Sequence, residues 1–197
     1  MFVGYREEVT RIIAGKAGSL RLEVPQGPTR PTSERVREAM FSTIEHLVDL
    51  DTASVLDLYA GSGALGLEAA SRGATRVVFV DSSKKVETVL KTNVARLQRA
   101  LGGDVSFQVA AVPALTYCQK IPPGESFDLV VLDPPYDVSA DDVVGCLQAL
   151  HHTLHDDSLV VVERSKKSTE PVWPHTYERV NHKTYGDTAV FYVRPRR

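Results

Sequence analysis

Four consecutive residues, Asp133-Pro134-Pro135-Tyr136, combine the groups needed to hold a flat ring that carries an amine. They follow the apolar run 127–132, which is typical of a buried parallel strand. The two prolines remove two N–H donors and force an extended turn, so the Pro134 carbonyl is expected to stay outside any helix. Asp133 and this carbonyl can then accept hydrogen bonds from an exocyclic NH2 while Tyr136 stacks on the ring. We therefore take Asp133, Pro134, Pro135 and Tyr136 as candidate catalytic residues; an ordinary strand-to-loop turn is the alternative interpretation.

A glycine-rich turn lies earlier in the chain, between a predicted strand at 55–58 and a predicted helix. Gly61 and Gly63 allow a ligand to approach the backbone closely, and Gly66 allows tight packing of the helix on a strand. A second strand at 76–80 ends at Asp81. An acid about 20 residues past the first glycine, at a strand end, is placed to hold two ribose hydroxyls.

The same glycine pattern also fits a dinucleotide-binding turn, so the cofactor must be chosen on other grounds. Asp57 places a carboxylate at the tip of the first strand, where it would repel a pyrophosphate and attract a sulfonium or an ammonium. No Tyr-x-x-x-Lys pair, a common dehydrogenase arrangement, occurs in the chain. S-adenosylmethionine, with S-adenosylhomocysteine as its product, is therefore the preferred cofactor, and a dinucleotide-dependent oxidoreductase is the lower alternative.

The N-terminal part supplies candidate cations. Segments 10–16 and 20–24 are predicted to form a small hairpin with its turn at 17–19, and a helix should begin after Thr32 or Ser33, either of which can cap it. Cations here suit phosphate contacts, although charged edge strands or a solvated helix surface would look the same. The cations that could contact the phosphates of a polyanion, which is RNA if the family resemblance described below holds, are Arg11, Lys16, Arg21, Arg30, Arg35 and Arg37.

Composition limits the function classes. The net charge is −2, with basic ends around an acidic centre, which would suit a polyanion held at the ends. No apolar run approaches the roughly 20 residues that span a bilayer, and the N-terminus lacks a signal-peptide pattern, so no membrane partner is expected. Cys118 and Cys146 lie far apart in sequence without metal-ligand spacing, which favours a reduced, cytoplasmic protein without a metal.

The remaining pattern is that of an α/β protein. Helices are predicted at 84–101 and 141–152, strands at 105–109 and 158–163, and a hairpin of 180–182 with 188–193. We expect a single domain that binds S-adenosylmethionine at 31–197 and an N-terminal extension at 1–30 that carries the small hairpin. A monomer is expected.

The blocks that run from Asp57 to Ala69 and from Asp133 to Tyr136 resemble class I S-adenosylmethionine-dependent N-methyltransferases. With Arg30 to Glu38 and Tyr185 to Thr188, the chain resembles the bacterial family of 16S ribosomal RNA guanine-N2 methyltransferases over about residues 10–193. The resemblance implies a Rossmann-like fold with a seven-stranded, mostly parallel sheet, a C-terminal antiparallel hairpin and a small N-terminal β-hairpin. It also implies methylation of one hairpin-loop guanine in the assembled small (30S) subunit.

The resemblance assigns roles to matching positions. Asp57 and Gly61 to Gly63 would face the methionine half of the cofactor, and Asp81 its ribose. Ala111 stands where the family has an acid for the adenine, which leaves only backbone contact. The expected cofactor-binding residues are Asp57, Tyr59, Ala60, Gly61, Ser62, Gly63, Asp81, Ser82 and Ala111.

Other functions remain open from the sequence. A DNA or RNA amino-methyltransferase acting on adenine N6 or cytosine N4 shares the Asp-Pro-Pro-Tyr chemistry. A protein-glutamine methyltransferase more often carries Asn where Asp133 stands, and a non-catalytic RNA-binding protein could use the same fold.

Overall fold

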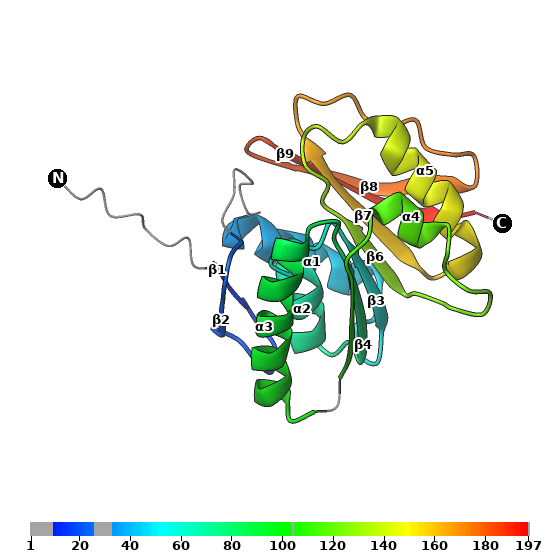
Figure 1. The fold of residues 1–197 in the computed structure, drawn as a ribbon. Coiled ribbons are helices and arrows are strands. Elements are labelled where there is room, and N and C mark those ends of the chain that lie inside the picture. The colour runs from blue at the N-terminus through cyan, green and yellow to red at the C-terminus, as the bar shows by residue number, and fades with distance from the viewer. Residues whose placement is uncertain (1–9, 26–32, 104, 197) are drawn as a thin grey trace.

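The computed structural model describes residues 10–25, 33–103 and 105–196, and its centre is a seven-stranded sheet (Figure 1). The strand order is β5-β4-β3-β6-β7-β9-β8. Strands β3 to β7 pair in parallel, while β9 runs antiparallel to both β7 and β8. The strands are β3 (Ser54–Leu58), β4 (Arg76–Val80), β5 (Ser106–Ala110), β6 (Leu129–Leu132), β7 (Leu159–Ser165), β8 (Tyr177–Tyr185) and β9 (Thr188–Pro195). The predicted fold class is confirmed.

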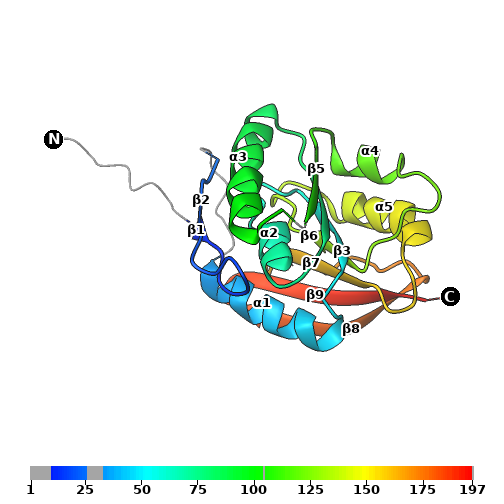
Figure 2. The same ribbon diagram turned by 90° about the horizontal axis from the view of Figure 1, so that it is seen from below.

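Helices cover both faces of the sheet (Figure 2). One face carries α1 (Glu34–Leu47), α2 (Ala64–Ser71) and α3 (Lys84–Leu101); the other carries α4 (Ala114–Cys118) and α5 (Ala140–Leu150), which continues into a 3-10 turn at His151–Thr153. Successive strand residues point to opposite faces, so Val55 joins the core under α1 to α3 and Leu56 joins the core under α4 and α5. The buried strands therefore read as continuous apolar runs.

Serine caps define where three helices begin. The Ser33, Ser83 and Ser139 hydroxyls accept hydrogen bonds from the N–H groups of Val36, Val86 and Asp142, as N-cap residues do. Helix α3 has the predicted bounds. The sequence prediction missed α4, which is too short to show a clear period. None of the described helices is long and apolar enough to cross a bilayer.

The N-terminal hairpin is shorter than predicted and belongs to the core. Its strands are β1 (Thr10–Arg11) and β2 (Arg21–Leu22), with Thr10 paired to Leu22. The segment between them consists of turns and bends. Gly15 in this segment lies so close to the end of α2 that a Cβ there would overlap the Ser71 carbonyl. Ile12 and Leu22 are buried among residues of α1 to α3. The predicted domain boundary at residue 30 lies outside the described residues and stays a prediction.

The contact of α2 with β4 requires a glycine. A Cβ at Gly66 would lie 2.5 Å from Phe79 Cε1 and 2.8 Å from Val77 Cγ1. Gly145 in α5 is a matched control, because its Cβ would meet nothing nearer than Leu115 Cδ1 at 3.4 Å.

We expect Gly66→Ala to lower the free energy of unfolding by about 1–3 kcal/mol, the usual cost of overpacking. Gly145→Ala should instead raise it by roughly 0.5–1 kcal/mol, since alanine favours a helix interior. Urea unfolding at constant m-value measures both changes. Equal effects of the two substitutions would contradict the close approach of α2 to β4.

Candidate functional site

Three carboxylates meet at the carboxyl edge of the parallel strands. Asp57 lies in β3, while Asp81 and Asp133 directly follow β4 and β6, the two strands that flank β3. Burial is the main cause of the raised pKa of Asp57, and the charges of Asp133 and Asp81 raise it further. A cluster of negative charge at this edge favours a cationic ligand and disfavours a pyrophosphate.

Asp57 is buried, with 1% of its surface exposed. Its Oδ2 accepts a hydrogen bond from the Gly66 N–H at 2.9 Å, and its Oδ1 is buried without a partner among the described residues. Burial raises the pKa of Asp57 well above its ordinary value, and the Gly66 hydrogen bond opposes this rise. A buried oxygen of this kind is suited to an ammonium donor from a ligand, because an unpaired polar group in the interior is costly.

The glycine turn between β3 and α2 has an unusual backbone. Gly61 and Gly63 have φ values of 54° and 79°, and Tyr59 has a φ of 62° without being glycine. Left-handed backbone at a residue of this size costs free energy and concentrates at functional sites. Tyr59 is half-buried, and its burial raises the pKa of the hydroxyl group.

Cys118 of α4 and Cys146 of α5 are both buried in the core that these helices form with the sheet. The sequence prediction treated these cysteines as small apolar residues far apart in the chain, and the structure buries both in one core cluster. The interaction with Cys118 lowers the pKa of Cys146. Among the described residues, no group of three or more His, Cys, Asp or Glu side chains is arranged to hold a metal.

Asp81 contacts the glycine turn directly. Its Oδ2 accepts from the Gly61 N–H at 3.1 Å, and its Oδ1 accepts from Ser83 N–H at 2.9 Å. The Asp81 N–H donates to the Ala110 carbonyl at 3.2 Å, which places Ala111 beside it across the sheet edge. Ser82 is exposed where α3 begins. The residues predicted to face the ribose and adenine are thus neighbours in the fold.

The Asp133-to-Tyr136 segment forms the turn after β6. The turn is closed at Pro135, whose carbonyl accepts from the Val138 N–H at 3.0 Å. Asp133 is half-buried and Pro134 is buried, whereas Tyr136 is 71% exposed. The aromatic ring is therefore accessible at the same edge as the three carboxylates, which is the combination that an amine-bearing ring requires.

The six predicted RNA-binding cations differ in their exposure to solvent. Arg11, Lys16, Arg21 and Arg35 are exposed, and Arg11 pairs with Glu34 at 3.0 Å. Arg30 lies outside the described residues.

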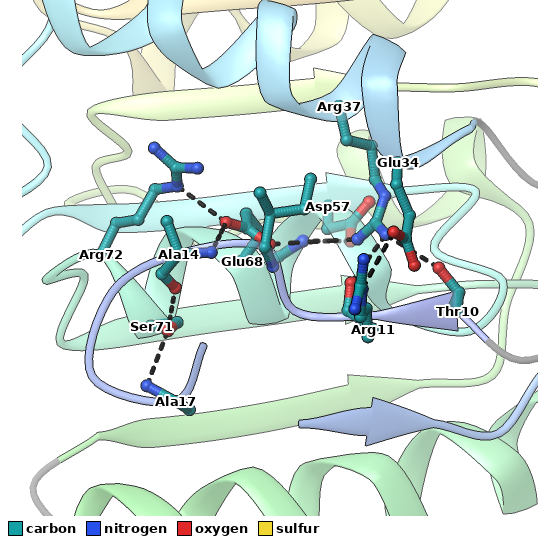
Figure 3. A network of polar contacts seen from close by, with 12 residues as sticks. Thr10, Arg11, Ala14, Ala17, Glu34, Arg37, Asp57, Glu68, Ser71 and Arg72 are labelled. Carbon is teal, nitrogen blue, oxygen red and sulfur yellow. Dashed lines mark hydrogen bonds and ion pairs between the residues drawn. The ribbon is translucent and has the colours of Figure 1, made fainter. Parts of the chain in front are cut away.

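The prediction for Arg37 is wrong. Its side chain is fully buried and donates to Thr10 Oγ1 at 2.8 Å and to the Arg11 carbonyl at 2.7 Å (Figure 3). Burial lowers the pKa of Arg37, and the nearby Glu68 and Glu34 oppose this. Arg37 shares the core-facing side of α1 with Met40 and Ile44 at helical spacing, and this pattern was the signal that it faces inward.

Glu68 is the partner that sequence reasoning missed. It is fully buried, accepts from the N–H groups of Ile13 and Ala14 at 2.7 and 3.0 Å, and pairs with Arg72 at 2.8 Å (Figure 3). Helix α2, which starts at the glycine turn, therefore holds the N-terminal hairpin with the residues of its last turns. A glutamate within an apolar helix segment was the only sequence signal.

Comparison with known proteins decides the family. The family model described as conserved hypothetical protein 95 matches residues 10–194. The chain is 32% identical over 181 residues to the ribosomal RNA small subunit methyltransferase D of Escherichia coli K12, covering 91% of this chain and 86% of the relative. The chain therefore belongs to the family that this model describes and that includes methyltransferase D. The Haemophilus influenzae relative of the same name is 31% identical over 177 residues, covering 89% of each chain.

Solved structures agree with this assignment. The Escherichia coli protein yhhF superimposes with a TM-score of 0.80 at 28% identity, covering 95% of this chain and 98% of that one. A protein of the bacterium Thermus gives a TM-score of 0.76 at 30% identity, covering 93% and 98%. The family members therefore share the sheet whose edge holds Asp57, Asp81 and Asp133 in this chain.

In the absence of cofactor, we expect Asp57→Asn to have a higher free energy of unfolding than the wild type, by a margin that grows as the pH rises. Because the pKa of Asp57 is raised on folding, the folded state holds this proton more tightly than the unfolded chain, and stability falls as pH rises above the ordinary value of 3.8. The substitution removes this titration. Urea unfolding from about pH 4 to 8 should show a gap in favour of the variant that widens with pH; a gap independent of pH would contradict the burial of an ionisable Asp57.

Proposed function

We propose that this protein transfers a methyl group from S-adenosylmethionine to the exocyclic N2 amine of one guanine in small-subunit ribosomal RNA, within the assembled 30S particle. The observation that carries the proposal is that Asp133 lies close to Asp57 at the edge of the sheet where the glycine turn begins, with the exposed Tyr136 three residues further on. The family relatives are named ribosomal RNA small subunit methyltransferases, which supports ribosomal RNA as the substrate class.

The residues at the sheet edge fit this cofactor. The buried Asp57 Oδ1 offers an acceptor for the ammonium of the methionine half. Asp81 has a carboxylate at the end of β4, where a ribose would lie in a fold of this class. The local negative charge favours a sulfonium over a dinucleotide phosphate, which argues against the oxidoreductase alternative.

The chain itself supplies positioning for the reaction. Bound S-adenosylmethionine supplies an electrophilic methyl group, so the protein must mainly hold the amine in line with it. Such orientation can contribute roughly 7–11 kcal/mol of the barrier. Asp133 and the Pro134 carbonyl would accept hydrogen bonds from the NH2 group, favour a pyramidal nitrogen and offset the positive charge that develops there. No strong base is required, because the methylated cationic amine is acidic.

The target guanine must leave its stack to reach this edge. Recognition of this kind favours unpaired loop nucleotides, whose bases can turn outward. Tyr136, which is 71% exposed, offers a ring surface on which the base can stack. The exposed Arg11, Lys16, Arg21 and Arg35 would contact phosphates along the N-terminal hairpin and at α1.

Product analysis tests the proposal directly. The protein is incubated with labelled S-adenosylmethionine and with unmethylated small subunits, naked 16S RNA or DNA, and the products are digested to nucleosides and identified by mass spectrometry. N2-methylguanosine at one RNA position is the expected product. N6-methyladenine or N4-methylcytosine in DNA would replace this proposal with the alternative substrate.

Asp133→Ala should lower turnover by about 100-fold or more, on the scale of losing one preorganised partner of a reacting group, while changing cofactor affinity little. Asp137→Ala is the matched control, since Asp137 lies four residues on and is exposed; its turnover should stay within about twofold of wild type. Calorimetry and single-turnover assays separate the two effects. Parallel loss of cofactor binding in Asp133→Ala would contradict the assigned role.

A further inference from the structure

Asn93 is a fully buried polar residue in the middle of α3 that the sequence reasoning did not single out. Its Nδ2 donates to the Ser62 carbonyl at 2.9 Å and to the Glu23 carbonyl at 2.8 Å, and its Oδ1 accepts from the Glu23 N–H at 2.8 Å. All three partners are backbone groups. The opposite amide orientation would set an oxygen against two carbonyl oxygens, so only this one satisfies every partner.

The bond to Ser62 fixes one peptide plane of the glycine turn. The Ser62–Gly63 peptide has its carbonyl held by Asn93, and its N–H, on Gly63, donates to the Ala60 carbonyl at 2.7 Å. The Ala60–Gly61 peptide is held in a similar way, since its N–H, on Gly61, donates to Asp81 at 3.1 Å. Two of the peptide planes that form the turn therefore have both polar groups bonded within the protein.

The peptide between them is different. The Gly61–Ser62 peptide has no hydrogen-bond partner for its C=O or N–H among the described residues, and both residues are half-buried. Backbone groups of this kind are the ones that remain to bind a ligand. Their direction depends on the planes on either side, because neighbouring peptides share the Gly61 and Ser62 dihedral angles.

Helix α3 also supports the turn by packing. A Cβ on Gly63 would overlap Leu90 Cδ1, and Leu90 lies one helical turn before Asn93. The same face of α3 therefore contacts the turn with an apolar side chain and an amide. On its other side, Asn93 binds the backbone of Glu23, directly after β2.

We infer that Asn93 is a positioning residue for cofactor binding, which sets the Ser62–Gly63 peptide and links the glycine turn to the N-terminal hairpin. This inference rests on the proposed function, since it assigns the bound ligand of the turn as S-adenosylmethionine. Loss of the amide frees the Ser62 carbonyl to rotate, so the Gly61–Ser62 peptide is no longer held ready for the ligand. The expected signature is weaker cofactor binding with chemistry left intact.

The test uses two Asn93 variants and one control. Asn93→Asp keeps the acceptor for the Glu23 N–H but replaces the donor to the Ser62 and Glu23 carbonyls with an oxygen. Asn93→Ala removes the whole amide. Ser71→Ala is the control, because Ser71 is buried at the other end of α2 and binds the hairpin through Ala17 N–H (3.0 Å) and the Ala14 carbonyl (2.6 Å), away from the turn. It separates loosening of the hairpin from loosening of the turn.

Calorimetry measures the Kd of S-adenosylhomocysteine for each protein, and steady-state assays on small subunits measure KM and kcat. Both Asn93 variants should raise this Kd, and the KM for S-adenosylmethionine, by about 10-fold or more. This is the usual effect of losing an uncharged hydrogen bond and leaving its buried partner unpaired. Their kcat at saturating cofactor should stay within about twofold of wild type, as for uniform binding. Ser71→Ala should leave the Kd within about twofold.

The remaining outcomes distinguish a failure of the proposed methyltransferase function from a failure of the proposed role of Asn93. Wild-type protein that binds no S-adenosylhomocysteine overturns the proposed function. Wild-type binding together with unchanged Kd in both Asn93 variants overturns the role of Asn93 alone. An equal rise of Kd in Ser71→Ala, or unfolding of both Asn93 variants at about 25 °C while Ser71→Ala stays folded, shows that Asn93 supports the fold rather than the turn.

Discussion

A buried carboxylate with one unpaired oxygen dominates the site. Asp57 gives one oxygen to the Gly66 N–H and keeps the other buried without a partner among the described residues, next to the charges of Asp81 and Asp133. In the protein alone this arrangement costs stability, because burial disfavours the ionised form. A cationic ligand removes the cost, and the strand end is therefore selective for positive charge before any contact with the rest of the ligand is made.

The turn beside Asp57 must be rigid for that selectivity to be useful. Its strained Tyr59 backbone and its two left-handed glycines are held from several directions: Asp81 bonds Gly61, Asn93 bonds Ser62, and Phe79 and Val77 leave no room for a side chain at Gly66. Strained backbone persists only where the surroundings over-determine it. The packing of α2 and α3 on the sheet thus serves the site as much as the core.

The N-terminal hairpin takes part in the same support. Glu68 and Ser71 of α2 bind its turn, Asn93 of α3 binds its end, and Arg37 of α1 binds its start. Arg37 and Glu68 lie 4.0 Å apart with both side chains buried, and removing one member of a buried pair is strongly destabilising because the other charge is left uncompensated. A segment that would contact RNA under the proposed function is therefore built onto the helices that shape the cofactor turn.

Periodicity and turn chemistry in the sequence determined most of the secondary structure and the candidate site. Asp57, Asp81 and Asp133 lie at or near the ends of apolar runs, which predicted parallel strands with carboxylates at one edge of the sheet, since parallel strands place their carboxyl ends together. The structure brings these three carboxylates together. The role of each in binding stays a prediction. Residues with local signals, such as the Ser33 cap and Gly66, were also read correctly.

Only the tertiary structure decided which groups pair with the buried polar side chains. Arg37, Glu68 and Asn93 are polar residues on helices, and by type alone such residues are mostly exposed. Each is buried because backbone groups of a distant segment, the hairpin at 10–25, supply its hydrogen-bond partners. Helical spacing does place Arg37 and Asn93 on the core-facing sides of their helices. Their hydrogen-bond partners, however, lie 26 to 70 residues away in the chain, so only the folded structure could show which backbone groups satisfy them.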